Sequence, residues 1–206
     1  MHRSTLILSI GCAVLLFGCA GLPVPAGSIR GSGKIATRDY ALTGFTGVDA
    51  CCGYIVHVSG GDRFKVTVAT DDNVLDALVV EKQGDNLRLA FDTVKFPSVQ
   101  TTQLQAEVTL PSLQTVTLSG GSRLTLAGAV PGGTALTVTA SGGAEADLAG
   151  MAVQKASVNL SGGARAAVNV TGSLDYDLST GAHLDIIGHP TIGIANVSGG
   201  ASAASK

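Results

Sequence analysis

The chain contains no tryptophan, and aromatic residues make up only 4% of its 206 residues. A core without large aromatic side chains must be filled by Ala, Val, Leu and Ile, which suits many thin, regular layers better than one large core. Charged residues account for 14%, the net charge is −2, and no basic cluster is present. The sequence therefore lacks the electrostatic signature of a nucleic-acid-binding protein.

Motifs of common catalytic sites are missing as well. The sequence contains no Gly-x-Ser-x-Gly, no phosphate-binding loop, no dinucleotide fingerprint and no His-Glu-x-x-His. We therefore expect no catalytic residues, no cofactor and no metal site, and a protein that is not an enzyme. The 28 glycines show no three-residue period, and their natural use is in regularly spaced turns.

The N-terminal residues have the features of an export signal. His2 and Arg3 precede an apolar run, Leu6–Phe17, that is too short to span a bilayer. We predict a signal peptide over residues 1–18, followed by a flexible tether over residues 19–33, which is rich in Pro and Gly.

The end of this signal resembles the bacterial lipobox. Leu16–Cys19 has a small residue directly before the Cys, which in lipoproteins becomes the lipidated N-terminus. An ordinary signal peptide cut near Ala20 is the alternative. We predict lipidation of Cys19 and attachment to the membrane through that lipid. The absence of Asp after Cys19 resembles Gram-negative sorting to the outer membrane.

Two further cysteines, Cys51 and Cys52, are adjacent in the sequence. They are interpreted either as two small hydrophobic residues on opposite faces of a strand, as a vicinal disulfide or reactive dithiol, or as metal ligands. A bond between neighbours is strained, because a trans peptide holds the two Cα atoms only ~3.8 Å apart.

A repeated Ser-Gly-Gly organises the second half of the chain. Successive Ser residues are 22, 20, 18 and 19 positions apart, and periods near twenty indicate a solenoid. The repeated turn residues are Ser119, Gly120, Gly121, Ser141, Gly142, Gly143, Ser161, Gly162, Gly163, Ser179, Gly181, Ser198, Gly199 and Gly200.

The residues around these turns alternate between apolar and polar in the same register in every repeat. One position before each Ser stand Leu118, Ala140, Leu160, Leu178 and Val197. This period of two predicts short strands on both sides of each turn. Matching residue types at equivalent positions favour stacked parallel strands over a meander of hairpins. We predict an all-β fold with a right-handed parallel β-helix or solenoid over residues 114–206.

The region 34–113 is less regular. It contains several strand-like runs and a hairpin turn at Gly84–Asn86, and the acidic pair at residues 71–72 precedes a single helical turn near Asn73–Ala77. We predict that this β section caps the solenoid, so that residues 34–206 form one structural unit.

The outward positions of the repeats place charged side chains in one column. Stacking would align Arg123, Glu145, Arg165 and His183, whose signs alternate over the first three. A solvated charge ladder is the simplest interpretation. A His183 and Asp185 pair that binds a metal or acts as acid and base is the alternative. A second outward face is polar and uncharged, through Thr115, Thr117, Thr137, Thr139, Ser157 and Asn159.

The order of these motifs resembles a known family. An export signal, Phe45–Val48, and the run Leu110–Val116 precede the repeated Ser-Gly-Gly strands. Over roughly residues 40–206 the chain is similar to the family named "putative auto-transporter adhesin, head GIN domain". The resemblance implies a fold similar to right-handed β-helices and leaves the biochemical role open.

We expect a lipid-anchored envelope module for binding, adhesion or scaffolding, with a glycan or an envelope protein as partner and no nucleic acid. A polysaccharide-acting β-helix enzyme and a thiol-based envelope sensor built on Cys51 and Cys52 are the alternatives.

Overall fold

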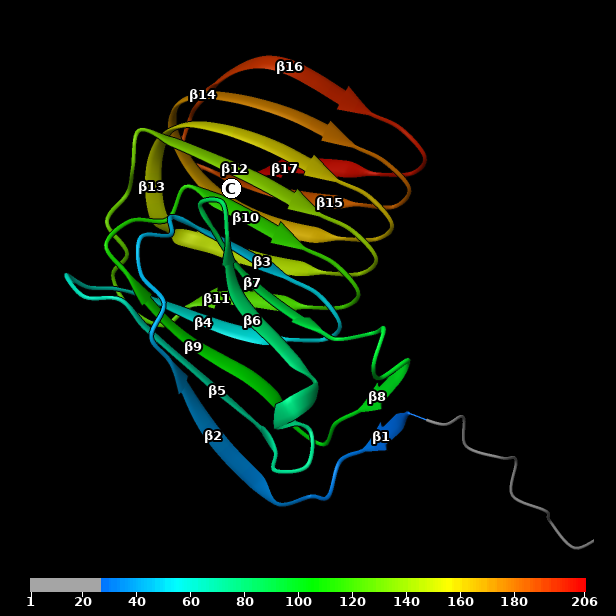
Figure 1. Cartoon of the computed structure of the whole chain (residues 1–206). Helices are drawn as coiled ribbons and strands as arrows, with labels where there is room; N and C mark the ends of the chain where they lie inside the picture. Colours follow the sequence, from blue (N-terminus) through cyan, green and yellow to red (C-terminus); the bar gives the residue numbers. More distant parts are fainter. Residues whose placement is uncertain (1–26) are drawn as a thin grey trace, which may run out of the picture.

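The computed structural model describes residues 27–206 and confirms the predicted all-β fold (Figure 1). Fifteen strands form one mixed sheet, and β1 and β8 form a separate two-stranded sheet. The predicted signal peptide, Cys19 and the first part of the tether lie outside the described residues. The strands are β1 Ser28–Arg30, β2 Ile35–Tyr40, β3 Gly47–Ala50, β4 Ile55–Gly60, β5 Lys65–Asp71, β6 Leu78–Gln83, β7 Asn86–Phe91, β8 Ser98–Gln100, β9 Leu104–Leu110, β10 Thr115–Leu118, β11 Arg123–Leu126, β12 Ala135–Ala140, β13 Glu145–Leu160, β14 Arg165–Leu178, β15 His183–Ile187, β16 Thr191–Val197 and β17 Ser202–Ser205.

The repeats pair as two parallel ladders. Ladder A runs through β7, β3, β10, β12 and the C-terminal parts of β13 and β14 to β16. Ladder B runs through β9, β4, β11 and the N-terminal parts of β13 and β14 to β15 and β17. Because every one of these pairs is parallel, the hairpin meander is excluded for the repeats. The handedness of the connections stays a prediction.

The register is the one read from the alternation in the sequence. Leu118 pairs with Ala140, Ala140 with Leu160, and Leu160 with Leu178. These inward side chains are at most 1% exposed, whereas their outward neighbours reach solvent. Equivalent positions of successive repeats therefore form continuous apolar columns, and these columns make up the core.

The Ser-Gly-Gly segments form the turns that lead from ladder A to ladder B. The two Gly positions have φ near +60° and +76°, a left-handed conformation that Gly adopts without a Cβ penalty. The turns also bond to one another, because the Gly143 amide donates to the Gly162 carbonyl at 3.0 Å and Gly121 donates to Gly142 at 3.1 Å. Thr180 takes the first Gly position of its turn, at φ 51°.

Cys51, Cys52 and Gly53 form a sixth turn of this column. Ala50 pairs with Leu118, so Cys51 lies beside Ser119 and Cys52 beside Gly120. Cys52 has a φ of 68°, close to the values of the repeated first Gly. A disulfide joins the two Cys residues. The interpretation as two hydrophobic residues on opposite strand faces is wrong, because they occupy the turn between β3 and β4.

The N-terminal part adds antiparallel strands to the parallel ladders. β5 pairs with β9 and β2, and β6 with β7 through the predicted turn at residues 84–86, which confirms that hairpin. A short 3-10 helix, Leu75–Ala77, lies within the predicted helical turn. The parallel pairing crosses residue 113, because β3 and β4 already belong to ladders A and B.

Part of the predicted tether belongs to the fold. Residues 28–30 form β1 beside β8, and buried Asp71 accepts hydrogen bonds from the Gly33 amide at 2.7 Å and the Thr102 amide at 2.8 Å. Burial disfavours the charged form of Asp71, but these hydrogen bonds outweigh it and lower the pKa of the carboxyl group. The Pro- and Gly-rich composition of this segment did not indicate the attachment, because the attachment depends on contacts with residues that are distant in the sequence.

Candidate functional site

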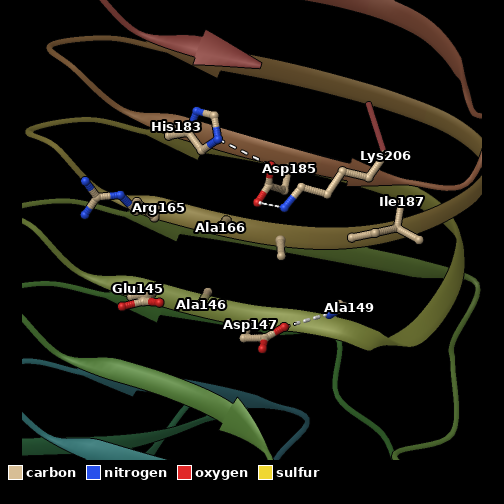
Figure 2. A pocket seen from close by; sticks show the side chains of 11 residues that line it. Glu145, Ala146, Asp147, Ala149, Arg165, Ala166, His183, Asp185, Ile187 and Lys206 are labelled. Atoms are coloured by element: carbon tan, nitrogen blue, oxygen red, sulfur yellow. Dashed lines mark hydrogen bonds and ion pairs between the residues drawn. The ribbon is translucent and has the colours of Figure 1, made fainter. Parts of the chain in front are cut away.

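The outer face of ladder B contains a hollow of about 380 Å³ (Figure 2). Its walls come from β13, β14 and β15, and from Lys206, which follows β17. Side chains of both charges line it: Glu145, Asp147, Arg165, His183, Asp185 and Lys206. The hollow therefore combines anionic and cationic groups at one place on a regular strand surface.

The first column of this face holds the four predicted ladder residues. Arg123 pairs with Glu145, Glu145 with Arg165, and Arg165 with His183. Arg123 forms a two-point contact with Glu145, in which Nε and Nη2 both donate to Oε2, at 2.9 and 2.6 Å. Both side chains are about half exposed, so the pair contributes little to stability.

The second column explains why the surface is hollow. It runs from Asp147 through Ala167 to Asp185, and Ala167 is the smallest of the three. With parallel strands ~4.8 Å apart, the two Asp residues stand roughly 9–10 Å from each other. A methyl group between two carboxylates leaves space that a longer side chain would fill.

Lys206 and His183 both contact Asp185. The Lys206 Nζ donates to Asp185 Oδ2 at 2.7 Å, and His183 Nε2 lies 3.3 Å from Asp185 Oδ1. His183 Nδ1 is 2.8 Å from the Ser202 hydroxyl. The hydrogen bond from the Lys206 ammonium outweighs the effect of burial and lowers the pKa of Asp185. Asp185 is therefore held in its ionised form.

Arg165 stands at the centre of the charge column. Within residues 27–206 no carboxylate forms an ion pair with its guanidinium, because Glu145 is engaged by Arg123. The side chain is exposed at the edge of the hollow (Figure 2). Its five N–H donors are thus free to bind a planar anionic group.

Sequence reasoning missed Lys206. The repeat register would have placed Lys206 on ladder B. β17 pairs with β15, and the Lys206 amide donates a hydrogen bond to the Ile186 carbonyl at 2.9 Å. That pairing places the residue two positions beyond Ala204, which faces Asp185.

Other predicted site residues lie apart from this column. The polar face formed by Thr115, Thr117, Thr137, Thr139, Ser157 and Asn159 belongs to ladder A. The Cys51–Cys52 disulfide lies in the turn before β4, where Cys52 is exposed. Across residues 27–206 no group of three or more His, Cys, Asp or Glu side chains is placed to hold a metal ion. No helix in this same range is long and apolar enough to cross a bilayer.

Comparison with solved structures identifies the fold. A putative adhesin from Bacteroides fragilis is 19% identical, with a TM-score of 0.54 over 86% of this chain and 98% of that chain. A putative adhesin from Parabacteroides merdae is 13% identical, with a TM-score of 0.51 over 88% and 100%. One from Parabacteroides distasonis is 16% identical, with a TM-score of 0.50 over 85% and 99%.

None of the curated proteins matches the chain. The sequence does match a protein family over residues 44–136 and 132–190, which is more than half of its length. This match agrees with the resemblance seen in the order of the sequence motifs, and it confirms that prediction. The chain therefore belongs to the family named "putative auto-transporter adhesin, head GIN domain".

Proposed function

We propose that this protein is a lipid-anchored binding module of the bacterial envelope, which holds a glycan in the hollow of ladder B. Adhesin-family membership and the export-type N-terminus support the location. The lipobox-like Leu16–Cys19 supports a lipid on Cys19, with the outer membrane of a Gram-negative cell as destination. Ladders A and B form the walls of a β-solenoid, and its connections are right-handed, as nearly all parallel crossovers are.

The observation that carries the proposal is the arrangement around Ala167. Two carboxylates, Asp147 and Asp185, flank a small apolar floor, and Arg165 at its edge forms no ion pair with any carboxylate of residues 27–206. Sugars present hydroxyl groups that donate to carboxylates and apolar ring faces that pack on small side chains. A carboxylate-bearing sugar would in addition engage Arg165 through two parallel hydrogen bonds.

The chemistry of the hollow favours binding over hydrolysis. The spacing of Asp147 and Asp185 lies near the ~6.5–9.5 Å that separates the carboxyl groups of inverting glycosidases. Such enzymes, however, need one carboxylic acid whose pKa is raised, so that it can protonate the leaving group. Lys206 lowers the pKa of Asp185 instead. The polysaccharide-acting enzyme is the competing function.

A glycan array probed with the full chain in detergent tests this proposal. We expect binding to glycans that contain uronic acids, and a loss of about tenfold or more in affinity for Arg165→Ala. The matched control is Asp177→Ala on ladder A, which leaves the hollow unchanged. Equal binding by the chain and both variants would contradict the site, and cleavage products from a bound glycan would favour the enzyme.

Lipid attachment is tested separately. Mass spectrometry of the N-terminal peptide from membrane-associated protein should show an acylated Cys19. The variant Cys19→Ala should leave the membrane fraction. An unmodified N-terminus that begins after Ala20 would contradict lipidation.

A further inference from the structure

The Cys51–Cys52 disulfide is open to solvent in the first turn between ladders A and B. Cys52 and Gly53 are exposed, and Cys51 is half-buried. The next turn of the column places Gly120 beside Cys52, and a glycine has no side chain that could cover the sulfur atoms. A thiol in solution can therefore approach the Cys52 sulfur.

The adjacency of the two residues disfavours the oxidised form. Their Cα atoms are 3.8 Å apart, below the ~4.4–6.8 Å of ordinary disulfides. Cys52 also has a left-handed φ of 68°, which a residue with a Cβ adopts only at an energetic cost. Disulfides that are constrained and exposed are more oxidising than buried structural ones, and they exchange more readily with thiols.

The bond contributes little to the fold, so it can open without unfolding the chain. A disulfide stabilises mainly by restricting the unfolded chain, and two neighbouring residues close the shortest possible loop. The Ser-Gly-Gly turns reach the same pair of positive φ angles without a cross-link. The Cys51 amide donates to the Leu89 carbonyl at 3.1 Å, and this contact does not involve sulfur. The same is true of the hydrogen bond from the Ser119 amide to the Ala50 carbonyl at 3.0 Å.

We propose that Cys51 and Cys52 form a reversible thiol–disulfide exchange site, which is reduced by a thiol that reaches it from solution. A thiolate attacks the exposed Cys52 sulfur, the disulfide bond breaks, and Cys51 leaves as a thiolate. A second thiolate then attacks the reductant's sulfur in this mixed disulfide and releases Cys52. Two reductant thiols become one disulfide, and their two protons end on Cys51 and Cys52. The hollow on ladder B takes no part, so this proposal does not depend on the glycan proposal.

Incubation of the full chain in detergent with mixtures of reduced and oxidised glutathione tests the exchange. Residues 39–63 form one tryptic peptide that contains Cys51 and Cys52 and no other cysteine, so its mass after alkylation reports their redox state. We expect excess reduced glutathione to give the dithiol in the folded chain, with an unchanged circular dichroism spectrum, and oxidised glutathione to restore the disulfide. A bond that stays closed until denaturant is added, a pair that never closes, or a reduced chain that unfolds would overturn the proposal.

Two matched single variants test which sulfur is attacked. Cys51→Ser leaves only the exposed thiol of the pair, and Cys52→Ser leaves only the half-buried one. With oxidised glutathione, the Cys51→Ser variant should form a mixed disulfide at least about tenfold faster than the Cys52→Ser variant, because exchange depends on access to the sulfur. The mass of the same tryptic peptide over time gives both rates. Equal rates, or a faster reaction of Cys52→Ser, would exclude attack at Cys52.

Discussion

The stacked turns allow a sharp test of how the repeats are held together. Gly162 and Gly163 are neighbours in one turn and have φ of 60° and 76°. A Cβ on Gly162 would lie 3.0 Å from the Gly142 nitrogen of the turn beneath, whereas a Cβ on Gly163 would meet nothing within 4 Å. The substitutions Gly162→Ala and Gly163→Ala therefore share the backbone conformation and differ in contact with the adjacent turn.

The magnitudes follow from these two differences. Left-handed backbone costs a residue with a Cβ ~1–2 kcal/mol, and the stiffer unfolded chain of the Ala variant returns ~0.4–1 kcal/mol. Gly163→Ala should thus lower the free energy of unfolding by roughly 0.5–1 kcal/mol. Gly162→Ala adds crowding against Gly142, which costs ~1–3 kcal/mol in a packed site, for a total of about 1.5–4 kcal/mol. Thr180→Gly removes a left-handed Thr and should raise it by roughly 0.5–1 kcal/mol.

Denaturant unfolding followed by circular dichroism measures all three variants. Midpoints compared at an unchanged m-value give the differences in free energy. Equal losses for Gly162→Ala and Gly163→Ala would refute the claim that contact between successive turns matters. A neutral effect of both would refute the claim that the left-handed backbone is required.

The remaining predictions concern the core, the first turn and acid stability. Leu160→Ala should lower the free energy of unfolding by ~2–5 kcal/mol, because the side chain is fully buried. Asn159→Ala, at an exposed position, should change it by less than about 0.5 kcal/mol. Equal effects in denaturant melts would contradict the alternation of inward and outward side chains. The double variant with Cys51→Ser and Cys52→Gly gives the first turn the Ser-Gly-Gly sequence of the repeated turns. Its free energy of unfolding should therefore lie within about 1 kcal/mol of that of the native chain. An unfolded product would show that the disulfide is essential. Asp71 has a lowered pKa in the folded state, so its contribution is complete above its unfolded pKa of ~3.9 and is lost as the pH falls through that value toward the folded one. Asp71→Asn should therefore unfold more easily at pH 7, and its stability should fall less on acidification. Thermal melts at pH 7 and near the unfolded pKa of ~3.9 measure both effects.

Much of the fold was accessible from the sequence because a repeat makes local information sufficient. The inward column through Leu118, Ala140 and Leu160 needs only alternation and a constant offset from Ser. The attachment of β1 was not accessible, because it depends on the contact between Gly33 and Asp71, 38 positions apart. Nothing in a Gly-rich segment indicates which distant carboxylate will accept a hydrogen bond from its backbone amide.

The candidate site was accessible to a smaller degree. The column from Arg123 to His183 follows from the repeat offset alone. The hollow does not, because it arises from the small size of Ala167 and from Lys206, which reaches back to Asp185. An ion pair between exposed side chains depends on their rotamers and on the path of the chain after the last turn. Neither of these recurs from repeat to repeat, so the sequence period does not predict them.

The six turns between ladders A and B show what a repeating protein has to preserve. Four of them use Ser-Gly-Gly, one has Thr180 at its second position, and one consists of Cys51, Cys52 and Gly53. All six reach the same pair of positive φ angles. Selection at these corners therefore acts on backbone shape, which several local chemistries can supply. A search by residue type finds only the Ser-Gly-Gly turns, whereas a search by backbone torsion angle finds all six turns, including the one that contains the Cys51–Cys52 disulfide.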